Sequence, residues 1–562
     1  MLQPSPRSTS TTGHRNLDPA HPLGVLAEAS SFVSAKDSAD RPDSASPGTD
    51  AYESPRDMGI ANSSYFNGKG EPVGQTSPIL EMLEVSDIEE LFRLFLDNIW
   101  VHLPIVERKR CTPLLVLQRS PPLFNAICCV SVKYYTAKPH LLAPLRQLAM
   151  DELAKFPTEK SLEFVQSQLA YLTWAVVPTA SHDDDMTWVR MGMTVRMALD
   201  LNMHRAGKID MGNSEKISLY EYFFGLHLYS APEWRVKSMR RTWLICMILE
   251  KTMAVQMGKP SLLWSHGVVQ ADLEENPGDS VELTRIFTAT EYSQLLERTL
   301  DTTTLMRSLT VGMDNDLPDV DVLFQRQLEN WRERGQRREA ARDGALPEGQ
   351  KAIQRARYKL YFSYGQLIIA SVGLQHSIDN DSTYKPFALA KYQTAALSVL
   401  HTFRDDWAAP GFSPYCTDFQ YSYVLYAAVS LLKSVQVQFS HSLLERVAVG
   451  RLISNIANLL EDAARVWDHL PLLQSKFLRR VLKARVPEFE ETPRGPLPTR
   501  LIIPEALSAH QSQVASPDLS FPQSSAVDYQ MNGQEDLWMQ NDFTETTFGR
   551  SDLFSWDDFV GT

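Results

Sequence analysis

The sequence predicts an all-α protein, a large multi-helix domain flanked by disordered N- and C-terminal segments. Three observations lead to this prediction. Apolar residues recur at helical spacing from about residue 80 to residue 485, and sustained strand-like alternation is nearly absent there. Both flanking segments are rich in small polar residues and proline, and such compositions do not form a packed core.

Composition divides the 562 residues into four segments. Residues 1–78 are expected to be a disordered Ser/Pro-rich linker, because they cannot bury enough apolar surface to offset the entropy lost on ordering. Residues 79–486 are expected to form the all-α domain, which is the regulatory domain of the resemblance described below. Residues 487–533 read as a Pro-, Ser- and Gln-rich linker, and residues 534–562 as an acidic-aromatic segment.

Charge and composition exclude several classes of protein. The net charge of -13 argues against a histone-like polyanion binder. No apolar run approaches the roughly 18 residues that would span a bilayer, and the N-terminus lacks the apolar core of a secretory signal. The five cysteines contain no Cys-x-x-Cys pair, which argues against a disulfide framework and a cysteine-based zinc site.

The first helix is expected to begin at Ser86, which is spaced with Glu89 as a capping box, and to end before Pro104. Residues 335–350 are expected to be a charged, solvated insert. Further helices are expected at residues 123–135, 162–177, 188–205, 239–257, 284–313, 321–334, 352–375, 386–407, 419–438, 443–469 and 472–484.

The segment from Trp188 to Arg205 is predicted to be a helix with one buried face and a cationic end. Arg196 and Asp200 are spaced to pair across one helical turn. His204 and Arg205 stand where the helix dipole favours cations, so capping is the expected role and ligand contact the alternative. The face expected to pack on the core consists of Trp188, Met191, Gly192, Val195, Ala198 and Leu199.

The segment from Met239 to Met257 is predicted to be a helix buried on nearly all sides, because Trp243–Leu249 is an unbroken apolar run. Gly258 and Pro260 are expected to end it. The charged pairs Arg240–Arg241 and Glu250–Lys251 would need partners, since a buried unpaired charge costs several kcal/mol. An Arg–acid network between this helix and the preceding one is the expected solution, as architecture rather than as an active site.

These two helices resemble the fungal-specific transcription factor domain, the middle homology region of fungal zinc-cluster (Zn2Cys6) regulators. The first carries Trp188, Gly192, Arg196, Ala198, Leu201, His204 and Arg205, as the family's signature helix does. Arg240-Arg241-Thr242-Trp243, Glu250-Lys251 and Gly258-Lys259-Pro260 follow in the family's order, and FLDNIWVHLPIVERKRC resembles the domain's opening. The resemblance covers residues 85–485. It implies a regulatory core at Trp188, Arg196, His204, Arg205, Arg240, Arg241, Trp243, Gly258 and Pro260.

The sequence departs from the family pattern at the zinc cluster. Members usually carry six cysteines near the N-terminus that hold two zinc ions, whereas no cysteine precedes Cys111 here. No zinc ions or other cofactors are therefore expected in this chain. Two explanations stay open: a cluster encoded upstream of Met1, or a regulator that reaches DNA through a partner.

The C-terminal segment resembles an acidic activation domain. Between Glu535 and Thr562 stand seven acidic residues, one arginine and six large aromatic residues. Mutual repulsion of the acids would keep the segment open and its aromatic side chains available to a groove on another protein. Leu553, Phe554, Trp556 and Phe559 would form one face of a short helix on binding. The alternative is a tail helix that docks on this protein's own core.

Other motifs have weaker functional interpretations. Ser181–Asp185 resembles part of an Asp-rich metal motif, but helix capping explains it better. The basic segment Lys476–Arg485 suggests phosphate contact or nuclear import, against a solvated or acid-paired helix face. The catalytic motifs of zinc proteases, α/β-hydrolases and phosphate-binding loops are absent from the sequence.

The sequence therefore predicts a nuclear fungal transcription regulator rather than an enzyme. Its helical domain would control the C-terminal activation segment at RNA polymerase II promoters. The partners implied are the transcription machinery or a coactivator, DNA bound directly or indirectly, a homo- or heterodimer with a zinc-cluster regulator, and a small-molecule effector, with no membrane. A cluster-less cofactor or repressor that dimerises with a zinc-cluster protein is the alternative, and an all-α enzyme the remote one.

Overall fold

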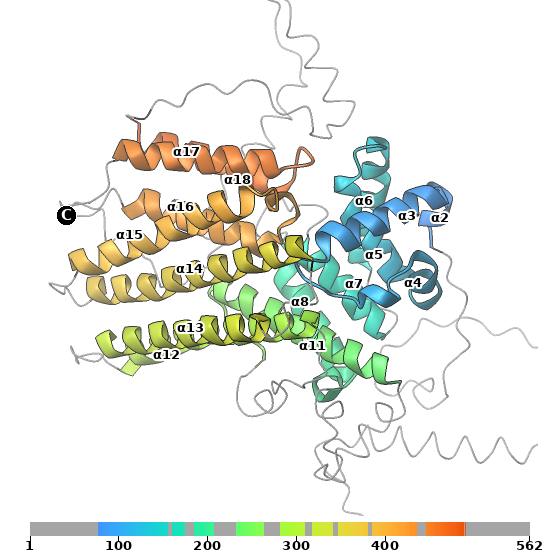
Figure 1. Cartoon of the computed structure of the whole chain (residues 1–562), viewed down its shortest axis with the longest axis horizontal. Helices are drawn as coiled ribbons and strands as arrows, with labels where there is room; N and C mark the ends of the chain where they lie inside the picture. Colours follow the sequence, from blue (N-terminus) through green and yellow to red (C-terminus); the bar gives the residue numbers. More distant parts are fainter. Residues whose placement is uncertain are drawn as a thin grey trace, which may run out of the picture. The chain divides into compact units, whose positions relative to one another are not determined.

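The computed structural model describes residues 77–155, 160–174, 185–206, 232–263, 281–309, 317–340, 347–379, 385–434, 446–487 and 489. Throughout these ranges the helix is the only extended regular element, which confirms the all-α prediction (Figure 1). The residues assigned to the N-terminal linker, except Ser77 and Pro78, and the whole acidic-aromatic segment lie outside them.

An N-terminal group of helices is arranged around α5. Nearly every side chain of α5 is buried, and it packs against α3, α4, α6 and α7. Pro121 begins α5, and the Ser120 hydroxyl caps it by accepting the Leu123 N–H at 3.3 Å. The helices are α2 (Ile79–Met82), α3 (Val85–Leu94, continued by the π-turn Phe95–Ile99), α4 (Pro113–Arg119), α5 (Pro121–Ser131), α6 (Leu142–Ala154), α7 (Leu162–Thr173) and α8 (Thr187–Asp200). Short 3-10 turns occupy Arg108–Arg110, Val132–Tyr134, Pro139–Leu141 and Met203–Arg205.

A second group consists of long helices that lie side by side (Figure 1). In it α14 packs between α13 and α15, α15 packs on α16, and α18 packs on α16 and α17. The helices are α12 (Val281–Leu309), α13 (Leu317–Ala340), α14 (Glu348–Asp379), α15 (Lys385–Thr402, continued by the π-turn Phe403–Ala408), α16 (Asp418–Ser434), α17 (Arg446–Ala463) and α18 (Leu470–Arg485), with a 3-10 turn at Ser413–Tyr415.

Helix α11 (Glu233–Met257) joins the two groups, because it packs on α7 and α8 on one side and on α12 on the other. Polar contacts also cross between the groups. The Arg357 guanidinium donates to the carbonyl of Val101 at 2.7 Å, and the Trp174 indole donates to the carbonyl of Tyr415 at 3.3 Å. The whole described region therefore shares one continuous core.

Three local predictions were wrong. The capping box is formed by Glu84 and Asp87 rather than by Ser86 and Glu89, and the Glu84 N–H donates to the Asp87 carboxylate at 3.2 Å. Asp87 takes this position because Tyr135 and Lys138 also bind its carboxylate, at 2.8 and 2.9 Å. These partners are distant in sequence, so no local pattern could indicate them.

The other two errors concern the limits of helices. Helix α13 continues to Ala340, so the first part of the expected insert is helical and Gly335 is buried against Tyr358 of α14. The helix expected over residues 443–469 ends at Ala463. The break lets Asp468 bind Arg146 of α6 at 2.5 Å, an ion pair between the two groups of helices.

We predict that His102 makes the fold acid-sensitive. It is buried beside the ring of Trp407, and burial, reinforced by the Arg357 charge, lowers its pKa from 6.5 to about 3. As the pH falls below 6.5 the unfolded chain protonates this histidine and the folded chain does not. The free energy of unfolding should then fall by up to about 1.4 kcal/mol per pH unit.

Denaturant unfolding between pH 7.5 and pH 5 would measure this effect. The His102→Gln variant should lose less stability on acidification than the parent chain. The matched variant His401→Gln changes an exposed histidine and should keep the parent's pH dependence. Equal pH dependence in His102→Gln and the parent would contradict the prediction.

Candidate regulatory site

Helix α8 presents most of the predicted face to the core. Met191, Gly192, Val195 and Ala198 are buried, as expected. Leu199 is exposed, however, and Trp188 is only half-buried. Thr194 is buried instead, since its hydroxyl donates to the carbonyl of Arg190 at 2.8 Å and is thereby satisfied.

The predicted pairing of Arg196 with Asp200 is wrong. The Asp200 carboxylate binds the ammonium group of Lys160, just before α7, at 2.6 Å. Arg196 is exposed on the surface of α8. Asp200 therefore pairs with a residue outside α8. A pair within the helix would have placed the arginine before the acid, which is the less favourable order.

His204 packs against the second predicted helix. Helix α8 ends at Asp200, and Asn202 adopts the left-handed conformation, with φ of 56°, before the turn Met203–Arg205. The His204 ring then lies edge-on to Trp243 of α11, with ring centroids 5.8 Å apart. Its Nε2 atom accepts a hydrogen bond from Arg205 at 3.2 Å. His204 and Trp243 thus belong to one contact between the two helices.

The charged residues in the middle of α11 find their partners outside α8. The ammonium group of Lys251 lies 2.5 Å from the Glu297 carboxylate on α12 and donates to the carbonyl of Leu263 at 2.7 Å. The Glu250 carboxylate accepts from the Ser261 hydroxyl at 2.7 Å and from the Leu262 N–H at 2.5 Å. Burial raises the pKa of Glu250, and the hydrogen bonds of the loop oppose that rise. The prediction that an Arg–acid network with α8 would satisfy Glu250 and Lys251 is therefore wrong.

The segment from Gly258 to Leu263, called here the α11 loop, connects these charges to α8. Gly258 ends α11 with φ of 59°, and the Lys259 N–H donates to the carbonyl of Ala254 at 3.0 Å. The Lys259 ammonium group lies 5.4 Å from the centre of the Trp188 ring. A Cβ atom on Gly192 would lie 3.3 Å from the Leu262 side chain. Glu250 and Gly258 thus fix the conformation of the α11 loop, which packs against α8. Pro260, in the middle of the loop, is exposed.

The two arginines near the start of α11 are buried, and both face α12. The Arg240 guanidinium lies 4.7 Å from the centre of the Phe287 ring. Burial lowers the pKa of Arg241, and the carboxylates of Glu282 and Glu107 oppose this shift. These are the acidic neighbours that burial requires, and they come from α12 and from the segment before Arg108 rather than from α8.

A second constellation, which the sequence analysis missed, lies at the N-terminal end of α11. The indole of Trp234 has two guanidinium groups over its ring, Arg110 at 4.4 Å and Arg119 at 4.8 Å. Leu114 and Leu115, on the same helix as Arg119, are 64% and 38% exposed. We call Arg110, Leu114, Leu115, Arg119 and Trp234 the Arg–Trp–Arg surface. No local pattern joins these positions, which come from a 3-10 turn, α4 and α11.

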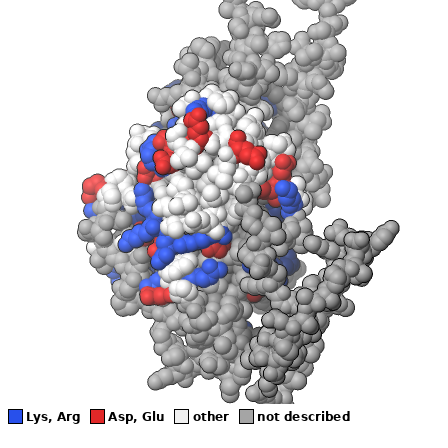
Figure 2. All heavy atoms as spheres, turned by 90° about the vertical axis from the view of Figure 1, so that its right-hand side faces the viewer, with Lys and Arg blue, Asp and Glu red and all other residues white. Residues whose placement is uncertain are grey.

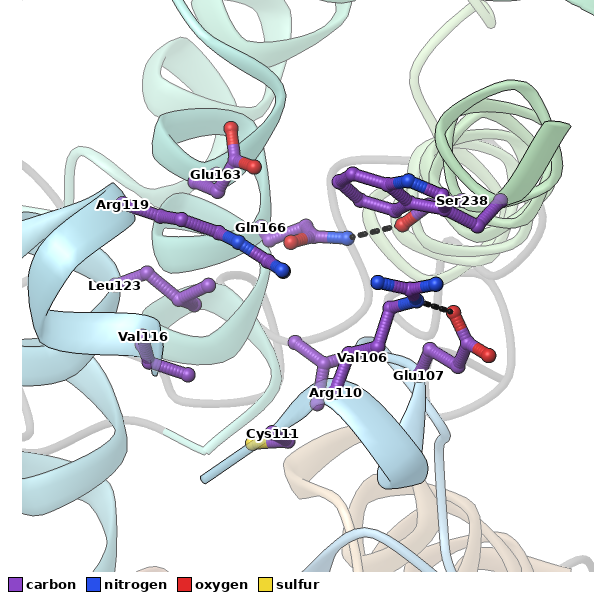
Figure 3. A pocket seen from close by; sticks show the side chains of 11 residues that line it. Val106, Glu107, Arg110, Cys111, Val116, Arg119, Leu123, Glu163, Gln166 and Ser238 are labelled. Atoms are coloured by element: carbon purple, nitrogen blue, oxygen red, sulfur yellow. Dashed lines mark hydrogen bonds and ion pairs between the residues drawn. The ribbon is translucent and has the colours of Figure 1, made fainter. Parts of the chain in front are cut away.

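A small pocket opens beside this surface (Figure 3). Its volume of about 30 Å³ is room for about two water molecules. Gln166 crosses the pocket wall and donates to the Ser238 hydroxyl at 3.3 Å, while Arg110 lies 3.4 Å from the Glu107 carboxylate. The lining residues are Val106, Glu107, Arg110, Cys111, Val116, Arg119, Leu123, Glu163, Gln166, Trp234 and Ser238. The pocket admits a carboxyl-sized group, whereas sites for drug-sized molecules have volumes of several hundred Å³.

Further basic residues neighbour the Arg–Trp–Arg surface in the sequence. Arg108, Lys109 and Lys237 are exposed close to it in sequence. Figure 2 shows one side of the molecule, with Lys and Arg side chains lying together in the lower half of the described surface. Some acids are interleaved, because Arg108 binds Asp97 at 2.6 Å and Lys237 binds Glu233 at 2.6 Å.

Other sequence features have structural roles or lie outside the described ranges. All five cysteines are buried thiols, and burial raises the pKa of Cys111 to about 12. In the part of the chain that the structure describes, no group of His, Cys, Asp and Glu is placed to hold a metal, and no helix is long and apolar enough to cross a membrane. Arg479 in the basic segment binds Glu461 of α17 at 3.0 Å. Leu553, Phe554, Trp556 and Phe559, like Ser181–Asp184, lie outside the described residues.

Comparison with known proteins matches residues 93–333 to the family described as the fungal specific transcription factor domain. The transcription factor opdL of Penicillium oxalicum is 27% identical over 210 residues, which are 35% of this chain and 36% of that protein. A regulatory protein of Saccharomyces cerevisiae is 24% identical over 271 residues, 44% of this chain and 29% of that protein. The chain thus spans about a third of the length of these curated relatives. No solved structure matches the chain. The matched range contains α8, the α11 loop and α11.

We predict that the buried pair Lys251–Glu297 is strongly coupled. Lys251→Met alone leaves the Glu297 carboxylate without its buried counter-charge and should lower the free energy of unfolding by about 3–5 kcal/mol. The double variant Lys251→Met/Glu297→Leu should recover much of that loss. Lys237→Met, which breaks an exposed pair on the same helix, should change stability little. Additive losses in the double variant would contradict the coupling.

We predict that Gly258 is required for the turn into the α11 loop. Gly258→Ala places a Cβ atom in the left-handed region and should lower the free energy of unfolding by about 1 kcal/mol, and Gly258→Asn by less. Gly373→Ala is the matched control, because a Cβ atom there meets nothing within 4 Å inside α14. The free energy of unfolding of Gly373→Ala should be unchanged or slightly higher than that of the parent chain. Denaturant unfolding measures all three, and an unchanged Gly258→Ala variant would refute the prediction.

Proposed function

The chain carries a fungal specific transcription factor domain over residues 93–333, and on this premise we propose that it is a fungal nuclear regulator of transcription. The family match is the observation that carries the proposal. Two relatives whose names are those of a transcription factor and a regulatory protein support it. We assign the chain a regulatory rather than an enzymatic role.

We further propose that the helical domain controls the acidic-aromatic segment of residues 534–562. The segment combines seven acidic residues with six large aromatic residues, a composition suited to recruiting a coactivator. The domain offers a means of control, because the α11 loop couples the buried charges of α11 to α8. A change in the loop would therefore be transmitted to both helices.

Contact with DNA is proposed to be direct if a zinc cluster is encoded upstream, and otherwise through a DNA-bound partner. The sequence before Cys111 contains no cysteine, and both routes stay open. Sequencing the 5′ end of the transcript separates the two. An in-frame segment with six cysteines would support direct binding, and its absence would support a homo- or heterodimer with a zinc-cluster regulator. A cofactor or repressor of such a partner is the alternative role.

We predict that residues 530–562, fused to a foreign DNA-binding domain, activate a reporter gene. Phe554→Ala/Trp556→Ala should abolish most of the activity, because the aromatic side chains supply the apolar contacts to a coactivator. Phe543→Ala/Phe548→Ala, which lies outside the proposed helix face, is the matched control and should retain more activity. An inactive parent fusion that is expressed at a normal level would refute the activator assignment.

A further inference from the structure

We propose that the Arg–Trp–Arg surface binds the acidic-aromatic segment of residues 534–562 of the same chain. The proposal builds on the proposed function, since it gives the regulated segment a defined docking place on the regulatory domain. Three properties of the surface support it: prearranged cations, a carboxyl-sized pocket and exposed leucines.

The two guanidinium groups are held ready to bind carboxylates. Stacking over the Trp234 ring, at 4.4 Å for Arg110 and 4.8 Å for Arg119, fixes the guanidinium positions and leaves N–H donors for other groups. Within the described residues Arg119 has no ion-pair partner. Arg110 has Glu107 at 3.4 Å. Because the arginines are already ordered, binding a carboxylate there costs less side-chain entropy.

The pocket favours the end of an acidic side chain over a free metabolite. Its volume of about 30 Å³ is enough for a carboxyl group but would leave most of a metabolite in solvent. Two arginines, Arg110 and Arg119, and two acids, Glu107 and Glu163, line it. Glu107 lies 3.4 Å from Arg110 and Glu163 lies 3.6 Å from Arg235, so Arg119 is the guanidinium that an entering carboxylate would meet. A peptide that places one carboxylate there must make its remaining contacts on the surface outside.

Exposed apolar side chains lie where those remaining contacts would form. Leu115 stands one helical turn before Arg119 on α4, so the two share a face, and Leu114 next to it is 64% exposed. Leucines beside a tryptophan and two arginines provide apolar and cationic contacts together, and Trp and Arg are enriched among the residues that dominate binding energy at interfaces. The surface therefore suits a peptide that alternates aromatic and acidic residues.

Residues 534–562 are the segment of this chain with that pattern. Acidic and aromatic residues alternate along it, with one arginine among seven acids. About 45 residues separate it from Phe489, and a chain of that length reaches roughly 150 Å when fully extended, so an intramolecular contact is within its reach. Linkage also raises the local concentration of the segment, so a weak contact is enough.

Photocrosslinking in the full-length chain tests the proposal. Leu114 is replaced by p-benzoylphenylalanine, and peptides joined to it are identified by mass spectrometry. The same replacement at Val322 on α13, which is 63% exposed, is the matched control position. We expect residues 534–562 to be the main product at Leu114 and not at Val322. Equal yields at both positions would overturn the proposal.

Charge variants test the chemistry of the contact. Arg119→Glu should lower the crosslinking yield about tenfold, as should roughly 1 M salt, in which the Debye length is about 3 Å. Arg355→Glu changes another exposed arginine, on α14, and should leave the yield unchanged. Trp234→Ala is a second variant, which frees both guanidinium groups and should also lower the yield. Crosslinking that persists unchanged in Arg119→Glu and Trp234→Ala would overturn the proposal.

Two further outcomes are informative. Mixed isotope-labelled and unlabelled chains reveal whether crosslinks join different molecules, and mainly intermolecular products would overturn the same-chain contact. The reporter fusion separates this inference from the proposed function. An active fusion without crosslinks at Leu114 would overturn the docking alone. An inactive fusion with Arg119-dependent crosslinks would support the docking and refute the activator assignment.

Discussion

The burial of four charged side chains on α11 is the constraint on which the rest of this structure depends. Arg240–Arg241 and Glu250–Lys251 lie in a helix that packs against other helices along most of its length. A charge in such a place must have partners, and the partners here come from outside α11, mainly from α12 and the α11 loop. Lys251 requires Glu297 of α12, and Glu250 requires the α11 loop. The two groups of helices are therefore joined through α11 by the buried Lys251–Glu297 ion pair as well as by apolar contact.

The same constraint explains why the α11 loop lies between the buried charges of α11 and helix α8. The Glu250 carboxylate binds Ser261 and Leu262 of the loop. The same loop places the Leu262 side chain beside Gly192 and the Lys259 ammonium group over the Trp188 ring. Trp188, Gly192, Glu250 and the α11 loop, which carry part of the family resemblance, thus contact one another. The buried residues among them stabilise the fold. The exposed chemistry lies elsewhere, at the N-terminal end of the same helix, where Trp234 and two arginines meet.

The fold was largely predictable because helices with apolar faces are local features. The end of α11 follows from Gly258, and the apolar run of α11 correctly indicated burial. The helix expected over residues 188–205 instead ends at Asp200, because Asn202 adopts the left-handed conformation. Pairing between charged residues was not predictable. Asp200 binds Lys160 rather than Arg196, because Lys160 comes from another element. Asp87 caps α3 in place of Glu89, and its carboxylate is also bound by the distant residues Tyr135 and Lys138. The Arg–Trp–Arg surface was missed for the same reason.

The sequence by itself determined the helical class, the approximate place of most helices and the resemblance to a transcription regulator, since helical periodicity and motif order are carried by neighbouring residues. Only the tertiary structure decided which charges pair, that Gly335 is buried on a helix rather than solvated in an insert, and that Arg110, Arg119 and Trp234 meet. The physical reason is that burial and electrostatic pairing depend on which elements pack together, and no local spacing records that choice.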